Sequence, residues 1–184
     1  MARVYDATDY GNPMSVREGI AAGLLGAGVV AVFYLLFDVI IRKQALWTPT
    51  VLGEVLVLQR PIAGEQGVDL TAVALYSVVH IVAFVVFGIV LTLLAARSER
   101  SALARYGTIQ LLIAFEVFFY GMLAVGLFKT NGAFPLWTIL LANSLAALAM
   151  CVWLWKRHPA VSAGWREPLG AARQEDVVTS ARRA

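Results

Sequence analysis

The stretch "YSVVHIVAFVVFGIV", residues 76–90, is almost wholly apolar and carries a single histidine, His80. It lies inside a longer apolar run, 71–96, that could cross a hydrocarbon core of about 30 Å. The run lacks the alternation of a barrel strand, so a helix is expected. Three more runs have the same character, and together they predict an all-α, four-transmembrane-helix bundle. The runs span about 19–41, 71–96, 106–128 and 135–155.

Composition points to the same class of protein. Of the 184 residues, 60% are hydrophobic and only 15% are charged, and the mean hydropathy is +0.74. Soluble domains are about half apolar and a quarter charged. The chain is therefore expected to be an integral membrane protein with membrane lipids as its surroundings. It has no basic patch with interleaved aromatic residues, so a nucleic-acid partner is not expected.

The distribution of Lys and Arg predicts the orientation in the membrane. Residues 1–18, the 97–105 loop and the segment from Lys156 onward hold 11 of the 15 basic residues. Basic residues favour the cytoplasmic side, so both termini are expected there, in a bacterial-type inner membrane. We divide the chain into a cytoplasmic N-terminal segment (1–18), a transmembrane domain (19–158) and a flexible cytoplasmic tail (159–184).

The connection between the first two predicted helices is not simply a polar loop. Thr48 followed by Pro49 is typical of a helix start, with threonine as the N-cap and proline in the first turn. The apolar residues that follow share one helical face, while Glu54 and Gln59 are expected to stay in water. We predict a short interfacial helix on the outer side. Its apolar residues are Val51, Leu52, Val55 and Leu58.

The first predicted helix carries small residues every fourth position, Gly19, Gly23, Ala27 and Ala31. Such a ridge lets two membrane helices approach closely. It predicts either packing within this bundle or docking of another subunit, and the sequence does not separate the two.

Polar residues converge at similar predicted depths, one from each helix. They are Asp38, His80, Glu116 and Asn143, and a tyrosine lies four residues from three of them, Tyr34, Tyr76 and Tyr120. An ionisable group at bilayer depth costs about 2.5–3.5 kcal/mol, so it normally faces the bundle interior and finds a partner. We predict a buried polar cluster of these residues. Asp38 has a second expected partner in Arg42, four residues later.

Three interpretations of this cluster stay open. It could be a structural hydrogen-bond network, or a proton or ion relay in which His80 titrates beside a carboxylate. It could also be a metal site whose candidate ligands are His80, Glu116 and Asp38. No cofactor is predicted, although a single metal ion, a lipid or a pigment is compatible with the sequence.

The chain has no catalytic motif and a single cysteine, Cys151, so we do not expect an enzyme. The sequence favours a non-catalytic accessory or structural subunit of a larger inner-membrane complex, for example a bioenergetic one. Other membrane-protein subunits would be its partners, with the small-residue faces and the cytoplasmic tail as docking surfaces. The alternative is an autonomous membrane protein that handles an ion, a proton or a metal through the polar cluster.

Overall fold

A computed structural model describes residues 15–61, 67–98, 102–127 and 135–159. These residues are almost entirely helical, and no strand lies among them. The long helices are α1 (Val16–Phe37), α3 (Leu70–Ser98), α4 (Ala102–Leu127) and α5 (Leu136–Arg157). Between α1 and α3 come a π-helical turn η2 (Asp38–Arg42), the short helix α2 (Trp47–Leu52) and a second π-helical turn η3 (Gly53–Val57).

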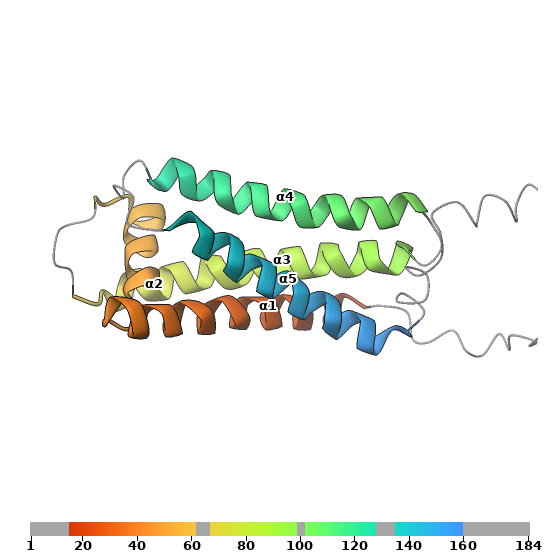
Figure 1. Cartoon of the computed structure of the whole chain (residues 1–184), viewed down its shortest axis with the longest axis horizontal. Coiled ribbons are helices and arrows are strands. Elements are labelled where there is room, and N and C mark those ends of the chain that lie inside the picture. Colours follow the sequence, from red (N-terminus) through yellow and green to blue (C-terminus); the bar gives the residue numbers. More distant parts are fainter. Residues whose placement is uncertain (1–14, 62–66, 99–101, 128–134, 160–184) are drawn as a thin grey trace, which may run out of the picture.

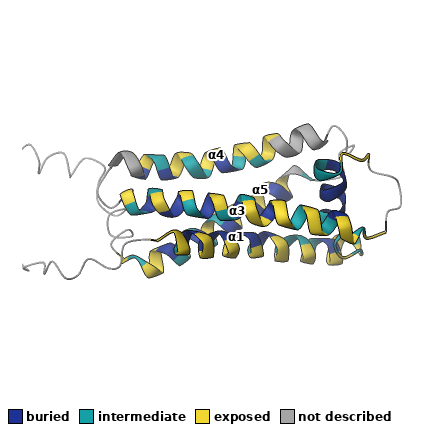
Figure 2. Cartoon of the chain, turned by 180° about the vertical axis from the view of Figure 1, so that it is seen from behind, coloured by how far each residue is buried: buried dark blue, intermediate teal, exposed yellow. Residues whose placement is uncertain are grey.

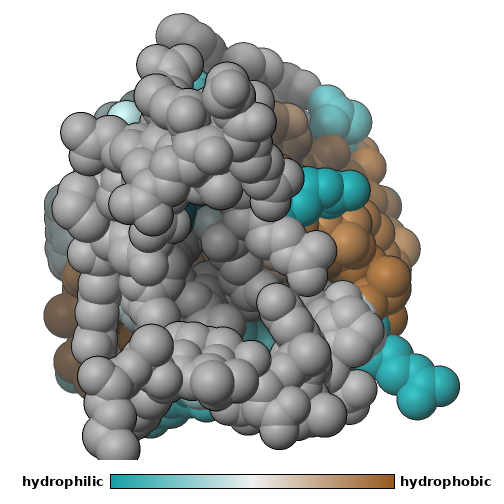
Figure 3. Space-filling model, turned by 90° about the vertical axis from the view of Figure 1, so that its right-hand side faces the viewer, coloured by the Kyte–Doolittle hydropathy of each residue, from teal (hydrophilic) through white to brown (hydrophobic). Residues whose placement is uncertain are grey.

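The long helices lie side by side, and α2 lies across one end of them (Figure 1). Helix α3 contacts both α1 and α4, and α5 contacts the same two helices. Within the described ranges, three helical segments are by length and composition able to cross a membrane, Val16–Arg42, Leu70–Ser98 and Trp137–Arg157. Viewed from the end where α1 begins, the described flank is largely hydrophobic and hydrophilic side chains lie at its rim (Figure 3).

Helices α1 and α3 are in close contact through their glycines. A Cβ atom added to Gly23 would lie 2.4 Å from the backbone oxygen of Phe84, and one added to Gly88 would lie 2.4 Å from that of Gly19. The two backbones therefore touch directly, as in other small-residue helix pairs. Ala27 is also buried, whereas Ala31 is exposed. The predicted ridge is thus occupied by α3 over its first three members.

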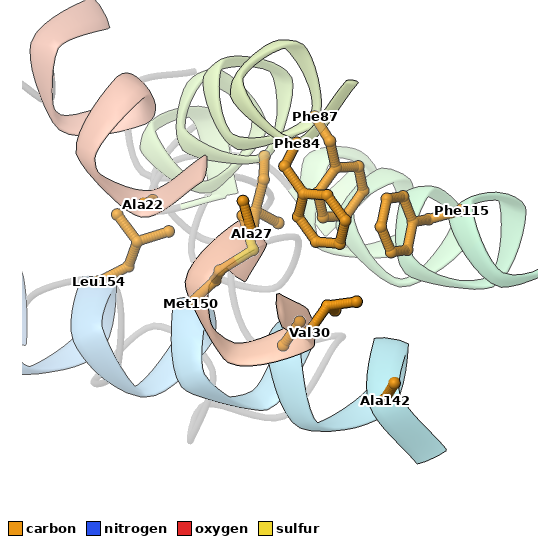
Figure 4. Packing of buried hydrophobic residues seen from close by; sticks show 11 residues of the cluster. Ala22, Ala27, Val30, Phe84, Phe87, Phe115, Ala142, Met150 and Leu154 are labelled. Carbon is orange, nitrogen blue, oxygen red and sulfur yellow. The ribbon is translucent and has the colours of Figure 1, made fainter. Parts of the chain in front are cut away.

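Aromatic side chains join α4 to this pair. Phe87 of α3 stacks on Phe115 of α4 with ring centroids 3.9 Å apart, and Phe84 meets Phe115 edge-on at 5.4 Å. Figure 4 shows these three rings together, with Met150 and Leu154 of α5 on the side of α1. The main core thus draws on all four long helices.

The connection between α1 and α3 differs from its prediction in two ways. Helix α2 begins at Trp47, so Pro49 lies inside its first turn and Thr48 is not the N-cap. Glu54, expected in water, is buried, and its Oε2 has no hydrogen-bond partner among the described residues. Gln59 is exposed as predicted.

Gly53 explains the burial of Glu54. A Cβ atom at Gly53 would lie 2.1 Å from the backbone oxygen of Ala72, so this segment rests directly on α3. Val51, Leu52 and Val55 pack with Ile139 of α5 in a second core cluster. Because both α3 and α5 cover the segment, no side of it is broadly exposed to water. Figure 2 shows that α2 is mostly buried.

Candidate functional site

Asp38 organises the end of the molecule at which α1 stops. Its side chain is fully buried and accepts two hydrogen bonds from Thr48, one from the backbone N–H to Oδ2 and one from the hydroxyl to Oδ1, both 2.7 Å long. The N-cap residue of α2, Leu46, makes no side-chain cap hydrogen bond. Asp38 therefore supplies, from the preceding helix, the acceptor that a helix start requires.

Arg42 completes this arrangement. Its Nε lies 3.6 Å from Asp38 Oδ1, which confirms the expected i,i+4 pair. The guanidinium carbon lies 3.5 Å from the ring centroid of Trp47, a cation–π geometry. Lys43 and Leu46 have φ values of 59° and 62°, a left-handed conformation that costs energy for residues other than glycine. The buried Asp38–Thr48 hydrogen bonds hold this tight reversal of the chain.

His80 interacts with α1 and not with a carboxylate. Its Nε2 lies 3.2 Å from the backbone oxygen of Ala27, so Nε2 carries the proton and donates. The ring lies between those of Tyr76 and Phe84, with centroid distances of 5.6 and 4.7 Å. These three residues are four apart and form one aromatic column along α3. His80 thus fixes the position of α3 against α1.

Tyr34 is half-buried and points to α5. Its hydroxyl lies 3.5 Å from Thr138 Oγ1, and that hydroxyl donates its own proton to the backbone oxygen of Pro135 at 2.7 Å. Tyr34 is therefore the donor in the first bond. This long hydrogen bond joins α1 to the start of α5, near the Asp38 end of the molecule.

Glu116 lies between α4 and α5. The hydroxyl of Ser144 donates to its Oε1 at 3.3 Å. The Asn143 amide lies beside the same carboxylate, but its Nδ2 is buried without a well-formed hydrogen bond among the described residues. Glu116 is half-buried, and Ser144 is exposed. This is a carboxylate on an otherwise apolar face.

The described residues do not gather the predicted polar residues into one hydrogen-bonded cluster. Asp38 belongs with Thr48 and Arg42, His80 with Ala27, Tyr34 with Thr138, and Glu116 with Ser144. Tyr76 stacks on His80, and Tyr120 is exposed one turn beyond Glu116. No group of three His, Cys, Asp or Glu within the described ranges is placed to hold a metal ion.

A contact at the opposite end was not predicted. His158 Nε2 lies 3.1 Å from Glu18 Oε1, which joins the end of α5 to the start of α1. Glu18 also forms a capping box with Ser15, in which each side chain bonds the other's backbone N–H. The S-x-x-E pattern at residues 15–18 was the available signal for this helix start. Its pairing with His158 has no local signal, because 140 residues separate the two.

Comparison of the chain with protein-family models, with curated proteins and with solved structures gives no significant match.

Proposed function

We propose that this protein is a non-catalytic accessory subunit of a larger complex in a bacterial-type inner membrane, with both termini in the cytoplasm. In this proposal α4 crosses the bilayer beside α1, α3 and α5. Its 26 residues have a helical length of about 39 Å, which exceeds a hydrocarbon core of about 30 Å. Helix α2 then lies at the outer end of a four-helix membrane bundle.

One observation carries the proposal, namely the polar groups on the exposed side of α4 and α5. We call this surface the α4–α5 face. Around Glu116 and Ser144 its residues are apolar and exposed, apart from the tyrosine hydroxyl. The face comprises Ile113, Glu116 and Tyr120 of α4 and Leu140, Leu141, Ser144 and Leu148 of α5. Lipid tails cannot satisfy a carboxylate, so such a surface favours contact with protein.

The burial of the small-residue ridge is a second reason to propose docking at the α4–α5 face. Gly19 and Gly23, which the sequence offered as a docking surface, lie against the backbone of α3 and are not accessible to a partner. The α4–α5 face takes their place in the proposal. The cytoplasmic tail, residues 159–184, is a further proposed docking segment, and from residue 160 it lies outside the described residues.

Native mass spectrometry of the tagged protein, extracted gently from its own membrane, tests this proposal. The expected spectrum shows a mass well above the 20.0 kDa of the chain, with other subunits attached. Deletion of residues 160–184 should weaken this assembly without preventing insertion of the bundle. A chain that is always alone would contradict the proposal. A lone chain with the added mass of a metal ion would favour the ion- or metal-handling alternative.

A further inference from the structure

Glu116 lies near the middle of a long apolar helix, and of the acidic residues that the structure describes it is the farthest from a helix end. It follows the start of α4 by 14 residues and precedes its end by 11, which corresponds to about 21 and 16 Å along the axis. If α4 spans the bilayer, the carboxylate sits close to the midplane. At that depth an uncompensated charge is strongly disfavoured and normally has a partner.

The described residues of this chain compensate the Glu116 carboxylate only in part. Ser144 donates one hydrogen bond of 3.3 Å, and within the described residues no Lys, Arg or His forms an ion pair with Glu116. Asn143 is 4% exposed, and its Nδ2 still lacks a well-formed hydrogen bond. The site thus combines a half-buried, half-satisfied carboxylate with a buried amide that is also incompletely satisfied.

A second copy of this chain would not complete the site. Every Lys and Arg of the described helices lies within four residues of a helix end, far from the depth of Glu116. A symmetric dimer through this face would also bring two carboxylates towards each other, because a twofold interface pairs each patch with itself. Like charges in a low-dielectric region repel strongly.

We therefore propose that the α4–α5 face binds a transmembrane helix of a different subunit, and that this helix carries a Lys or Arg side chain opposite Glu116. This inference rests on the proposed accessory function and specifies the partner at the same surface. The cation pairs with the Glu116 carboxylate, and Ser144 holds that carboxylate towards the partner. The exposed Ile113, Leu140 and Leu148 supply apolar packing around the pair.

Photo-crosslinking in the native membrane tests the inference. A photoreactive phenylalanine derivative replaces Leu148, which is exposed on the face one turn beyond Ser144. The matched control places it at Leu24, an exposed residue of α1 at a similar distance from the inner end of the bundle. We expect a crosslink to another protein from position 148 and not from position 24, and its peptide should contain a Lys or Arg near the crosslinked residue.

Charge substitutions then separate this inference from the proposed function. Glu116→Gln, which keeps the shape, should lower the crosslink yield about tenfold, the effect of losing a charged hydrogen bond. Ser144→Ala should lower it less. Glu116→Lys should abolish it, and exchanging the partner's basic residue for Glu should restore it. The thermal midpoint of each variant shows that the bundle itself is intact.

Each other result would overturn the inference in an identifiable way. A foreign subunit that crosslinks equally well to Glu116→Gln, or whose peptide has no basic residue, would leave the accessory function standing and refute the charge pair. A crosslink to a second copy of the chain would refute the heteromeric partner. Absence of any protein crosslink from either position, with a lone chain in the mass spectrum, would refute both proposals.

Discussion

Most buried polar residues in the described part of the chain have a hydrogen-bonding neighbour, and that neighbour determines their role. His80 donates to a backbone oxygen of α1, and a backbone carbonyl cannot pass a proton onward. Asp38 receives two short hydrogen bonds and faces a guanidinium group, so its charge is compensated on several sides. These environments suit structural roles for both residues, whereas the Glu116 carboxylate receives only the one long hydrogen bond from Ser144.

Substitution of Asp38 should destabilise the protein more than removal of a single hydrogen bond. Asp38→Ala leaves Arg42 without its carboxylate and Thr48 N–H without its acceptor, which should cost about 3 kcal/mol of unfolding free energy. Thr48→Val is the matched control, because it removes only the hydroxyl and should cost about 1 kcal/mol. Thermal unfolding in mild detergent, followed by tryptophan fluorescence, measures both. Equal effects would show that the backbone cap and ion pair contribute nothing.

At the scale of helices, the contact of α1 with α3 depends on the absence of side chains at specific positions. Gly19, Gly23 and Gly88 bring the two backbones into van der Waals contact over about one turn of each helix. Close approach of this kind strengthens packing between membrane helices, which lack a hydrophobic driving force in lipid. Gly53 plays the same part where η3 rests on α3.

A pair of glycine substitutions tests this contact. Gly23→Ala places a methyl group against the backbone of Phe84 and should lower stability by about 2 kcal/mol, the usual cost of overpacking. Gly28→Ala is the control on the same helix, because nothing lies within 4 Å of its Cβ position. It should leave the thermal midpoint unchanged or raise it slightly. If the Gly23→Ala variant were as stable as the Gly28→Ala variant, α1 and α3 would have to lie farther apart than the contact of Gly23 with Phe84 implies.

The long helices could be predicted from the sequence, because each depends on a run of apolar residues that is visible locally. The observed ends lie within four residues of the predicted ones. The start of α2 could not be placed in the same way, since its capping acceptor, Asp38, lies in another helix. The burial of Glu54 depends on Gly53 lying against Ala72, a contact between segments that a local pattern does not report.

The sequence did not predict that the polar residues lie apart, and the reason is related. Depth along a helix can be estimated from residue counts, and on that basis His80, Glu116 and Asn143 lay in one layer. The direction in which each side chain points around its helix depends on how the helices are rotated. In this protein His80 hydrogen-bonds to α1, whereas Glu116 hydrogen-bonds to Ser144 of α5. The helix glycines set the first of these rotations.

At the scale of the whole molecule, the two ends of the bundle differ in character. One end carries α2, the Asp38–Thr48 hydrogen bonds and the exposed Gln59. The other end carries Lys156, Arg157 and the pair of His158 with Glu18. Basic residues concentrate at the second end, so it is expected to face the cytoplasm.

Cysteine accessibility tests this orientation. In a Cys151→Ser background, Gln59→Cys should react with a membrane-impermeant maleimide added to intact cells. Lys156→Cys should react only after the membrane is permeabilised, because its end of the bundle is expected to face the cytoplasm. Both positions are exposed, so a difference in labelling reports the side of the membrane and not burial. The reverse labelling pattern would show that the protein has the opposite orientation.

The contact of His158 with Glu18 has a consequence for the order in which the molecule is built. The Asp38–Thr48 hydrogen bonds join residues 10 positions apart, so the α1–α2 corner can form soon after it leaves the ribosome. The His158–Glu18 pair joins residues 140 positions apart and must wait until α5 has been synthesised. During translation we therefore expect the α2 end of the bundle to form first, and the ends of α1 and α5 that His158 and Glu18 join to come together last.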